Sequence, residues 1–564
     1  MTLLDWAVLS ATILGIVVVG VWKNRRPTTS DAYLRGGYEL RWPTIGLSVM
    51  ATQASAITFL SVPGQAYEDG MRFVQFYFGL PLAMIVVSAV FVPIYYRLHV
   101  FTAYEYLEQR FDVKVRLLGA FLFLIQRGLA AGITLYAPAI ILSTILGWPL
   151  EPTVVVIGAL VIVYTVTGGS KAVSQTQKQQ MIVMMGGMCL AAIVIAWALP
   201  EGVGVVDASH VAGALGRMRI VDFGIDMESR YTFWSGLTGG FFLALSYFGT
   251  DQSQVGRYLT AKNIAESRLG LLMNGVLKIP MQAFILFVGV LMFAFYQWTA
   301  PPLFFNESLS SRVAAAAPDE LSALDDEWRR VHGEKARAAT AFVEARAADD
   351  AVALAHARAA LVTHHKAIDD VRARAKALAS ERVPGAETKD SDYVFLTFVK
   401  RFMPSGLFGL LIAVILSAAM SSIASELSAL GTTTTIDFYK RLLRRDADDR
   451  QTVFASKAFT VMWGLVAIGF ASFAALLDNL IQAVNILGSL FYGTVLGLFV
   501  VAFFIRRVGA RAVLFGALVA QSAVIALYFT SSIGYLWFNV IGCAIVVVLS
   551  LAASFVVRER AVTA

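Results

Sequence analysis

The sequence predicts an all-α membrane protein with about thirteen transmembrane helices, because apolar runs long enough to cross a bilayer recur along it. Of its 564 residues, 57% are hydrophobic and 15% are charged, whereas soluble domains carry about 25% charged residues. The basic residues stand in short segments between the apolar runs, not in one patch. The net charge of +7 therefore reflects membrane topology in a lipid bilayer, and this distribution excludes nucleic-acid binding.

The predicted spans follow one another closely, apart from one long interruption. They cover residues 3–22, 43–67, 73–98, 115–146, 153–167, 179–199, 233–249, 268–298, 404–435, 453–476, 479–505, 511–531 and 534–557. Alternate connections are basic, and these are 23–35, 110–116, 171–178, 257–268, 440–445, 506–511 and 558–560. The opposite connections, such as 147–152 and 477–479, nearly lack Lys and Arg. In a cell (inner) membrane, the positive-inside rule then predicts an outside N-terminus and a cytoplasmic C-terminus.

The interruption, residues 300–392, is rich in Ala, Arg, Asp and Glu and contains no apolar span. Its good helix formers predict two amphipathic helices, 317–346 and 348–381, which form a soluble hairpin on the outer face. Long loops are exempt from the positive-inside rule, so its arginines do not contradict this orientation. The hairpin is interpreted as an incidental insertion or as a docking stalk for an extramembrane protein partner.

Three residues of the span 404–435 predict part of a cation site. Ala418, Ser421 and Ser422 stand at i, i+3 and i+4, so one carbonyl and two hydroxyls converge on one helix face. Oxygen ligands suit a hard cation. Small residues at this spacing also allow close helix packing, which is the alternative interpretation. The two cysteines lie inside predicted spans, so we expect neither a disulfide nor any other metal site.

A helical carbonyl is already hydrogen-bonded, so a cation site also needs an interrupted helix with free carbonyls. The candidate interruption lies in the second span, where small and polar residues from Ala51 to Ser55 precede Pro63 and Gly64. Pro and Gly break the backbone ladder, and only a cavity or the protein interior tolerates such a break at membrane depth.

Charged residues inside apolar runs mark a second candidate region. Arg127 and Lys278 each lie well inside a run, where a charge costs about 2.5–3.5 kcal/mol and normally faces a cavity or a partner. Snorkelling to the membrane surface is the alternative. Glu426 lies one turn beyond the serine pair, with no partner evident from the sequence. Asp251 follows Gly249 at the end of the seventh span, which marks either a second broken helix or a polar helix end.

These residues resemble those of the sodium:solute symporter family, especially its iodide, monocarboxylate and multivitamin branch. The motifs are WPTIGLSVMATQASAITFLSVPG from Trp42, TAYEYLEQRF from Thr102, YTVTGGSKAV from Tyr164, DQSQVGRYLTAKN from Asp251 and SAAMSSIASELSALGTTTTIDFYKR from Ser417. The resemblance covers nearly the whole chain except residues 300–392. It implies a fold like that of the leucine transporter, with two inverted five-helix repeats whose first helices are broken.

The resemblance also implies a division of the chain. Residues 1–299 hold an extra N-terminal helix, the first repeat and the start of the second. Residues 300–392 are the hairpin insertion, 393–505 complete the second repeat, and 506–564 form C-terminal helices.

The resemblance further implies a sodium site at matching positions, with Na⁺ as the coupling ion. Its ligands fall on Ala51, Ala54, Ala418, Ser421 and Ser422. Family members often carry an Asp after the GG motif, linked to sodium release or to an additional sodium, whereas this chain has Gln177 there. An amide solvates a cation less strongly than a carboxylate, so we expect one sodium per cycle unless Glu426 supplies the missing charge.

The expected activity is sodium-coupled import of a small solute, not enzymatic catalysis. Sugar-contacting residues of hexose carriers are missing at the matching positions, and a buried Arg127 or Lys278 suits an organic anion such as a monocarboxylate. The alternatives are a sugar, sialic acid or another neutral or zwitterionic solute, and a transporter-like ligand sensor. The predicted substrate residues are Gln53, Gln75, Phe76, Tyr77, Phe248 and Asp251, with Tyr492 as a lid; helix packing is the alternative role of these aromatic rings.

Overall fold

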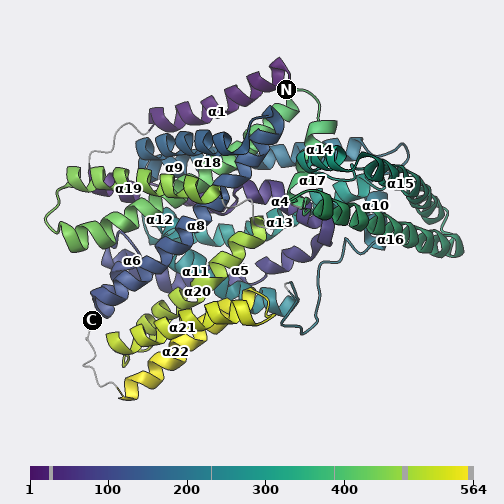
Figure 1. The fold of residues 1–564 in the computed structure, drawn as a ribbon. Coiled ribbons are helices and arrows are strands. Elements are labelled where there is room, and N and C mark those ends of the chain that lie inside the picture. Colours follow the sequence, from purple (N-terminus) through teal and green to yellow (C-terminus); the bar gives the residue numbers. More distant parts are fainter. Residues whose placement is uncertain (24–28, 230, 387, 473–479, 557–564) are drawn as a thin grey trace.

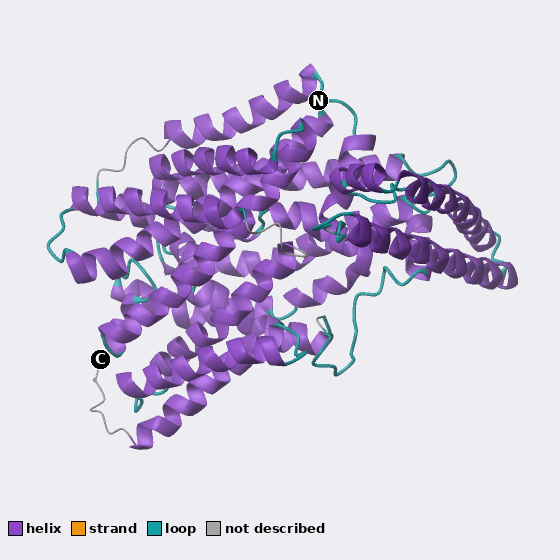
Figure 2. Cartoon of the chain, viewed as in Figure 1, coloured by secondary structure: helices purple, strands orange, loops and turns teal. Residues whose placement is uncertain are grey.

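The computed structural model describes residues 1–564 except 24–28, 230, 387, 473–479 and 557–564. The described residues form helices joined by loops, without a strand (Figure 2). Several sequence-based expectations therefore lie partly outside the described residues. They are the basic residues of 24–28 and 558–560, the connection 477–479, and the adjoining ends of the spans 453–476, 479–505 and 534–557.

The first half of the chain forms the following elements. They are α1 (Leu3–Lys23), α2 (Ser30–Arg35), η1 (Gly36–Tyr38), α3 (Trp42–Gln53), α4 (Ala56–Asp69), η2 (Gly70–Tyr77), α5 (Leu80–Val86), η3 (Val87–Phe91), α6 (Val92–Leu98), α7 (Glu105–Arg110), α8 (Val113–Leu146), α9 (Leu150–Trp197), α10 (Val205–Ala214), η4 (Ser235–Gly239), α11 (Gly240–Thr250), α12 (Gln252–Tyr258) and α13 (Ile264–Phe295).

The second half continues with the hairpin and the last membrane helices. These elements are α14 (Glu307–Ala316), α15 (Pro318–Ala347), α16 (Ala351–Arg382), α17 (Ser391–Phe402), α18 (Leu407–Thr433), η5 (Thr434–Leu443), α19 (Asp449–Ala471), α20 (Leu480–Phe504), α21 (Ala510–Thr530) and α22 (Leu536–Val556).

Ten helices within the described residues are long and apolar enough to cross a membrane, compared with the thirteen spans expected. The difference arises where helices are short or interrupted. Span 3–22 is α1, whose described apolar part is Leu3–Ile16. Span 43–67 is divided between α3 and α4, and span 233–249 between η4 and α11. Spans 153–167 and 179–199 are both in α9 but count as two of the ten, because the helix is kinked at Gly169, whose φ of 64° favours glycine.

Helix α18 lies in the centre of the bundle and packs against α1, α4, α8, α9 and α19. Helix α13 packs along both α3 and α4, and α20 packs against α8, α11 and α22. Figure 1 shows α1 on one side of the bundle and α21 and α22 on the other. The elements that surround α18 therefore come from distant parts of the sequence, and they enclose a polar interior.

The hairpin of α15 and α16 projects from one end of the bundle (Figure 1), in agreement with the two predicted helices. It has an apolar core that includes Trp328 and Val371. At its base, Arg372 donates to Asp390 at 2.8 Å and lies 4.9 Å from the Phe305 ring. Phe305 in turn contacts the ring of Tyr67 on α4, with ring centroids 5.5 Å apart. The hairpin base therefore reaches the end of α4 that lies away from the interruption, at Tyr67.

Candidate functional site

The helix interruption lies at Ala54 and Ser55, between the end of α3 and the start of α4. Ala54 leaves the helical region with φ −87° and ψ 77°, whereas Pro63 stays inside α4. The last carbonyls of a helix have no partner within it. The carbonyl of Ala51 is one of these, and it faces the serine pair of α18.

Oxygen atoms of the two helices meet at this point. The hydroxyl of Ser421 lies 3.0 Å from the Ala51 carbonyl oxygen and 2.9 Å from that of Ala418. The hydroxyl of Ser422 lies 3.5 Å from the Ala51 carbonyl oxygen. All of these residues and Ala54 are buried. The structure thus brings four oxygens from two helices together, which is a donor set that a hard cation accepts.

Gln177 of α9 fills a neighbouring group of oxygens. Its amide nitrogen donates to the Ser421 carbonyl at 2.9 Å, to Ser425 Oγ at 2.6 Å and to Thr52 Oγ1 at 3.0 Å. Its amide oxygen accepts from Ser48 Oγ at 2.5 Å. The neutral Gln177 amide is therefore surrounded by a cage of oxygen atoms of Ser48, Thr52, Ser421 and Ser425 and forms hydrogen bonds with all of them.

A charged cluster lies on another side of α18. Arg127 of α8 pairs through Nη2 with Asp251 and through Nη1 with Glu426, the latter at 3.1 Å. Its Nη2 also lies 2.5 Å from the hydroxyl of Tyr492, which is 2.9 Å from Asp251 Oδ2. Glu426 therefore has a partner, Arg127, that the sequence did not reveal.

Asp251 stands where α11 ends and α12 begins. Its Oδ1 accepts from the backbone N–H of Ser253 at 2.9 Å and from the hydroxyl of Ser253 at 2.6 Å. It therefore caps α12 and pairs with Arg127 at once, and the second broken helix predicted as one alternative lies here.

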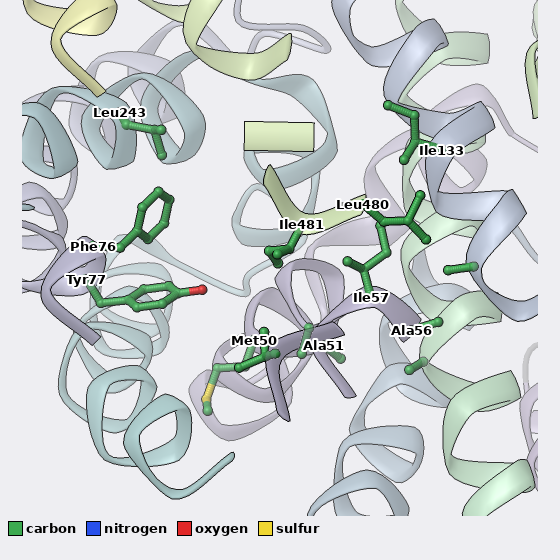
Figure 3. Close-up of a cluster of buried hydrophobic side chains, with 14 of the residues drawn as sticks. Met50, Ala51, Ala56, Ile57, Phe76, Tyr77, Ile133, Leu243, Leu480 and Ile481 are labelled. Carbon is green, nitrogen blue, oxygen red and sulfur yellow. The ribbon is translucent and has the colours of Figure 1, made fainter. Parts of the chain in front are cut away.

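A cavity of about 80 Å³ lies between these elements. Its lining residues are Thr52, Gln53, Ser55, Ile57, Thr58, Phe76, Tyr77, Arg127, Thr134, Leu243, Tyr247, Glu426, Ile481, Val484, Asn485 and Tyr492. Figure 3 shows the Tyr77 ring with its hydroxyl directed toward the space that faces Ile481, next to Met50 and Ala51 of α3. The cavity therefore adjoins the interrupted helix.

Gln53, Phe76, Tyr77 and the expected lid residue Tyr492 line this cavity. Gln75 and Phe248 are fully buried outside the lining. The Gln75 amide bonds instead to the backbone of Tyr231 and accepts from the N–H of Asp222. The sequence analysis missed three lining residues, Thr58, Tyr247 and Asn485. Of these, only Tyr247 could have been suspected from the sequence, because it lies one turn before Asp251.

Lys278 of α13 is fully buried, and its Nζ has no hydrogen-bond partner among the residues that the structure describes. The ammonium lies 5.5 Å from the centre of the Tyr77 ring. The alternative of snorkelling to the membrane surface therefore does not apply to Lys278. Lys278 does not line the cavity, but it packs against Tyr77, which does.

A small polar cavity beside an interrupted helix, enclosed by apolar spans, is the arrangement of a secondary transporter. Comparison with known proteins agrees with this class. The profile of the sodium:solute symporter family matches residues 33–311 and 346–520. The chain belongs to this family.

Two relatives come from the predicted branch. The chain is 28% identical over 505 residues to sodium-coupled monocarboxylate transporter 1 of Xenopus laevis, covering 88% of this chain and 67% of that transporter. It is 33% identical over 297 residues to the human sodium/iodide cotransporter, covering 52% of this chain and 45% of the cotransporter. The latter match thus spans less than half of that relative.

A solved structure shows the same fold. It is the substrate-bound, outward-open state of a Na⁺-coupled sialic acid symporter, with a TM-score of 0.76 and 24% identity over 99% of both chains. The predicted family, its leucine-transporter-like fold and transport instead of catalysis are thereby confirmed, and so is sodium as the coupling ion of the family. The inverted repeats, the division into segments and the orientation in the membrane stay predictions.

Proposed function

We propose that this protein is a sodium-coupled symporter that imports a small organic anion of the monocarboxylate kind. The observation that carries this proposal is the juxtaposition on α18 of a neutral oxygen site and a cavity lined by Arg127. The monocarboxylate relative, aligned over 88% of the chain, supports the same solute class. The chain would act in the cell (inner) membrane, with its N-terminus outside and its C-terminus in the cytoplasm.

The proposed sodium ligands are the carbonyl oxygens of Ala51, Ala54 and Ala418 and the hydroxyls of Ser421 and Ser422. Convergence of the Ala51 and Ala418 carbonyls on the serine hydroxyls supports this set. We propose one sodium per cycle, because the neighbouring cage already holds the Gln177 amide nitrogen. That nitrogen donates to the oxygens that a second cation would need.

The charges around the cavity support a solute with one negative charge. Arg127 and one sodium ion balance Asp251 and Glu426, with which Arg127 is paired. Lys278 then remains as a buried cation without a hydrogen-bond partner in the described part of the chain. A buried charge needs a counter-charge, and a monoanion in the cavity would supply one.

The size of the cavity supports a small solute. The volume of the cavity is only about 80 Å³. A sugar or sialic acid would require the cavity to widen, whereas a short carboxylate would need much less rearrangement. The predicted substrate residues Gln53, Phe76 and Tyr77 are proposed to contact the solute, and Tyr492 is proposed to cover it.

Coupling would follow from the shared helix. Sodium between Ala51 and the serine pair would hold α18 against α3, which stabilises the conformation in which α18 presents Glu426 and α8 presents Arg127 to the solute. Each ligand would then raise the affinity for the other by the same factor. Sodium entry down its gradient, with about 2.3 kcal/mol per charge for each 100 mV, would drive uptake.

The test is a thermal-unfolding screen of the purified full-length protein against short carboxylates, halides, sugars, sialic acid and amino acids, each in sodium and in potassium. We expect a short carboxylate to raise the unfolding temperature in sodium only. If only a sugar or sialic acid raises the unfolding temperature, the proposed solute class is wrong and that compound takes its place. Stabilisation that is equal in potassium would contradict sodium coupling.

A further inference from the structure

The two carboxylates that hold Arg127 are not equally satisfied. Asp251 accepts from Arg127, from the hydroxyl of Tyr492 and, twice, from Ser253. Glu426 uses only Oε1, which accepts from Arg127 at 3.1 Å and lies 3.5 Å from the Thr134 hydroxyl. Its Oε2 has no hydrogen-bond partner among the described residues.

Glu426 is 6% exposed and lines the cavity. A buried charged oxygen without a hydrogen bond destabilises the folded protein more than a neutral one does, because no protein group replaces the water that it loses. No described residue donates to it: the terminal nitrogens of Arg127 contact Glu426 Oε1, Asp251 and Tyr492 instead, and Arg127 Nε has no partner among the described residues. A donor from within the cavity would supply the hydrogen bond that this oxygen lacks.

The size of the cavity and its other lining residues further restrict the solute that can donate to Glu426. The cavity is small, about 80 Å³, so a donor for Glu426 must lie within a few bonds of the carboxylate of the solute. The amide oxygen of Gln53, which also lines the cavity, is a further acceptor without a partner in the described structure. The cavity thus combines cations nearby with unpaired acceptors inside it.

We propose that the solute is a short carboxylate that carries a hydroxyl group, and that Glu426 selects it by accepting the hydroxyl hydrogen bond. This inference rests on the proposed function, and it narrows the solute class. A hydroxyl satisfies Oε2 and leaves the solute a monoanion, as the surrounding charges require. An ammonium would also donate, but it would make the solute a zwitterion and leave Lys278 without a counter-charge.

The consequence is strong discrimination against the carboxylate that lacks the hydroxyl. A site built to bond a solute hydroxyl rejects an analogue without it by far more than a site that merely accommodates it. Lactate and propionate form the simplest pair, since they differ only in the hydroxyl. We expect lactate to bind at least about tenfold more tightly than propionate in sodium.

The experiment titrates the purified full-length protein with lactate, propionate and alanine in sodium and in potassium, by calorimetry or by thermal shift. Tighter binding of lactate than of propionate, in sodium only, supports the proposal. Equal binding of lactate and propionate overturns it, and so does tighter binding of alanine than of lactate. If none of the three binds in a sodium-dependent way, the proposed function itself fails for short carboxylates.

Two variants test whether Glu426 is responsible. Glu426→Gln keeps a neutral acceptor, and Glu426→Met removes the acceptor while Asp251 still pairs with Arg127. We expect the ratio of lactate affinity to propionate affinity to shrink in Glu426→Gln and to fall to about 1 in Glu426→Met. A cooperative thermal-unfolding transition shows that each variant is folded.

The matched control is Thr432→Val, which removes a buried hydroxyl from the same helix outside the cavity; among the described residues, that hydroxyl bonds only to the Ser428 carbonyl. We expect this variant to keep the wild-type preference. An unchanged preference in Glu426→Met would show that another group reads the hydroxyl, and the assignment to Glu426 would be withdrawn.

Discussion

Two sides of α18 hold polar groups in opposite ways. On one side, Ser421 and Ser422 offer hydroxyls to backbone carbonyls, and no charged group of the protein takes part. On the other side, Glu426 joins a cluster of formal charges with Arg127 and Asp251. Both sides are buried to a similar degree, so burial does not explain the difference.

The difference separates two kinds of recognition. Neutral oxygens replace the hydration shell of a small bare cation without holding a permanent counter-charge that would retain it. A paired charged cluster keeps a fixed geometry and leaves particular groups for a larger solute. In the proposed mechanism, one helix thus links the two ligands while each proposed site keeps its own chemistry.

The largest effect should come from breaking the charged side. Arg127→Gln leaves Asp251 and Glu426 buried without a counter-charge. We therefore expect the free energy of unfolding to fall by about 3–5 kcal/mol, as for other broken buried ion pairs. Chemical denaturation in detergent measures it. The triple variant with Asp251→Asn and Glu426→Gln should recover most of this stability but not solute binding. No recovery would show that packing, not charge, holds the cluster.

Removing the two serine hydroxyls should change the stability of the fold less than Arg127→Gln does, but it should strongly weaken sodium binding. The double variant Ser421→Ala and Ser422→Ala removes two ligands at about 1.5–3 kcal/mol each, so the sodium concentration needed for solute binding should rise by about 100-fold or more. Ser417→Ala, a buried serine of the same helix, is the control. An unchanged sodium requirement in the double variant would refute the proposed site.

Removing the unpaired cation sharpens the comparison. Lys278→Met relieves a buried ammonium without a partner in the described structure, so the unfolding temperature should rise. Solute affinity should nevertheless fall by about tenfold, or about 1.4 kcal/mol, with the sodium requirement unchanged. Solute titrations at saturating sodium measure this. A variant that is more stable and binds the anion as well as wild type would exclude Lys278 from solute binding.

The smallest effect should follow from giving the neutral side a charge. Gln177→Asp replaces the amide nitrogen that fills the oxygen cage with a carboxylate oxygen, so a second sodium should bind there. The Hill coefficient for sodium should rise from about 1 toward about 2. Gln177→Asn keeps the amide and should keep a coefficient of about 1. A coefficient near 2 in the wild type would contradict the proposed stoichiometry.

The neutral site was largely predictable because it depends on local patterns. The spacing of Ala418, Ser421 and Ser422 puts their oxygens on one face of any helix, and the small residues around Ala54 precede a proline that marks the interrupted span. The two hairpin helices were also predictable, because their composition is rich in good helix formers. Their boundaries differ from the predicted ones by only a few residues.

The charged site was not predictable, because it depends on contacts distant in sequence. Arg127, Asp251 and Glu426 come from three helices, and no local pattern shows that they meet. Gln75 and Phe248 illustrate the same limit, since each is buried as expected of a binding residue but does not line the cavity. The count of thirteen spans stays a prediction, because a helix that is short on each side of a break does not reach the length needed to cross a membrane alone.

The contact between the hairpin base and Tyr67 gives the insertion a mechanical consequence. A helix of 30 residues such as α15 is about 45 Å long, so a tilt of about 5° at its base displaces the tip by about 4 Å. The tip lies far from both binding sites, so a fluorescent label there would not disturb them. A movement of the Tyr67 end of the interrupted helix that tilts the hairpin would therefore be larger at the tip than at the base.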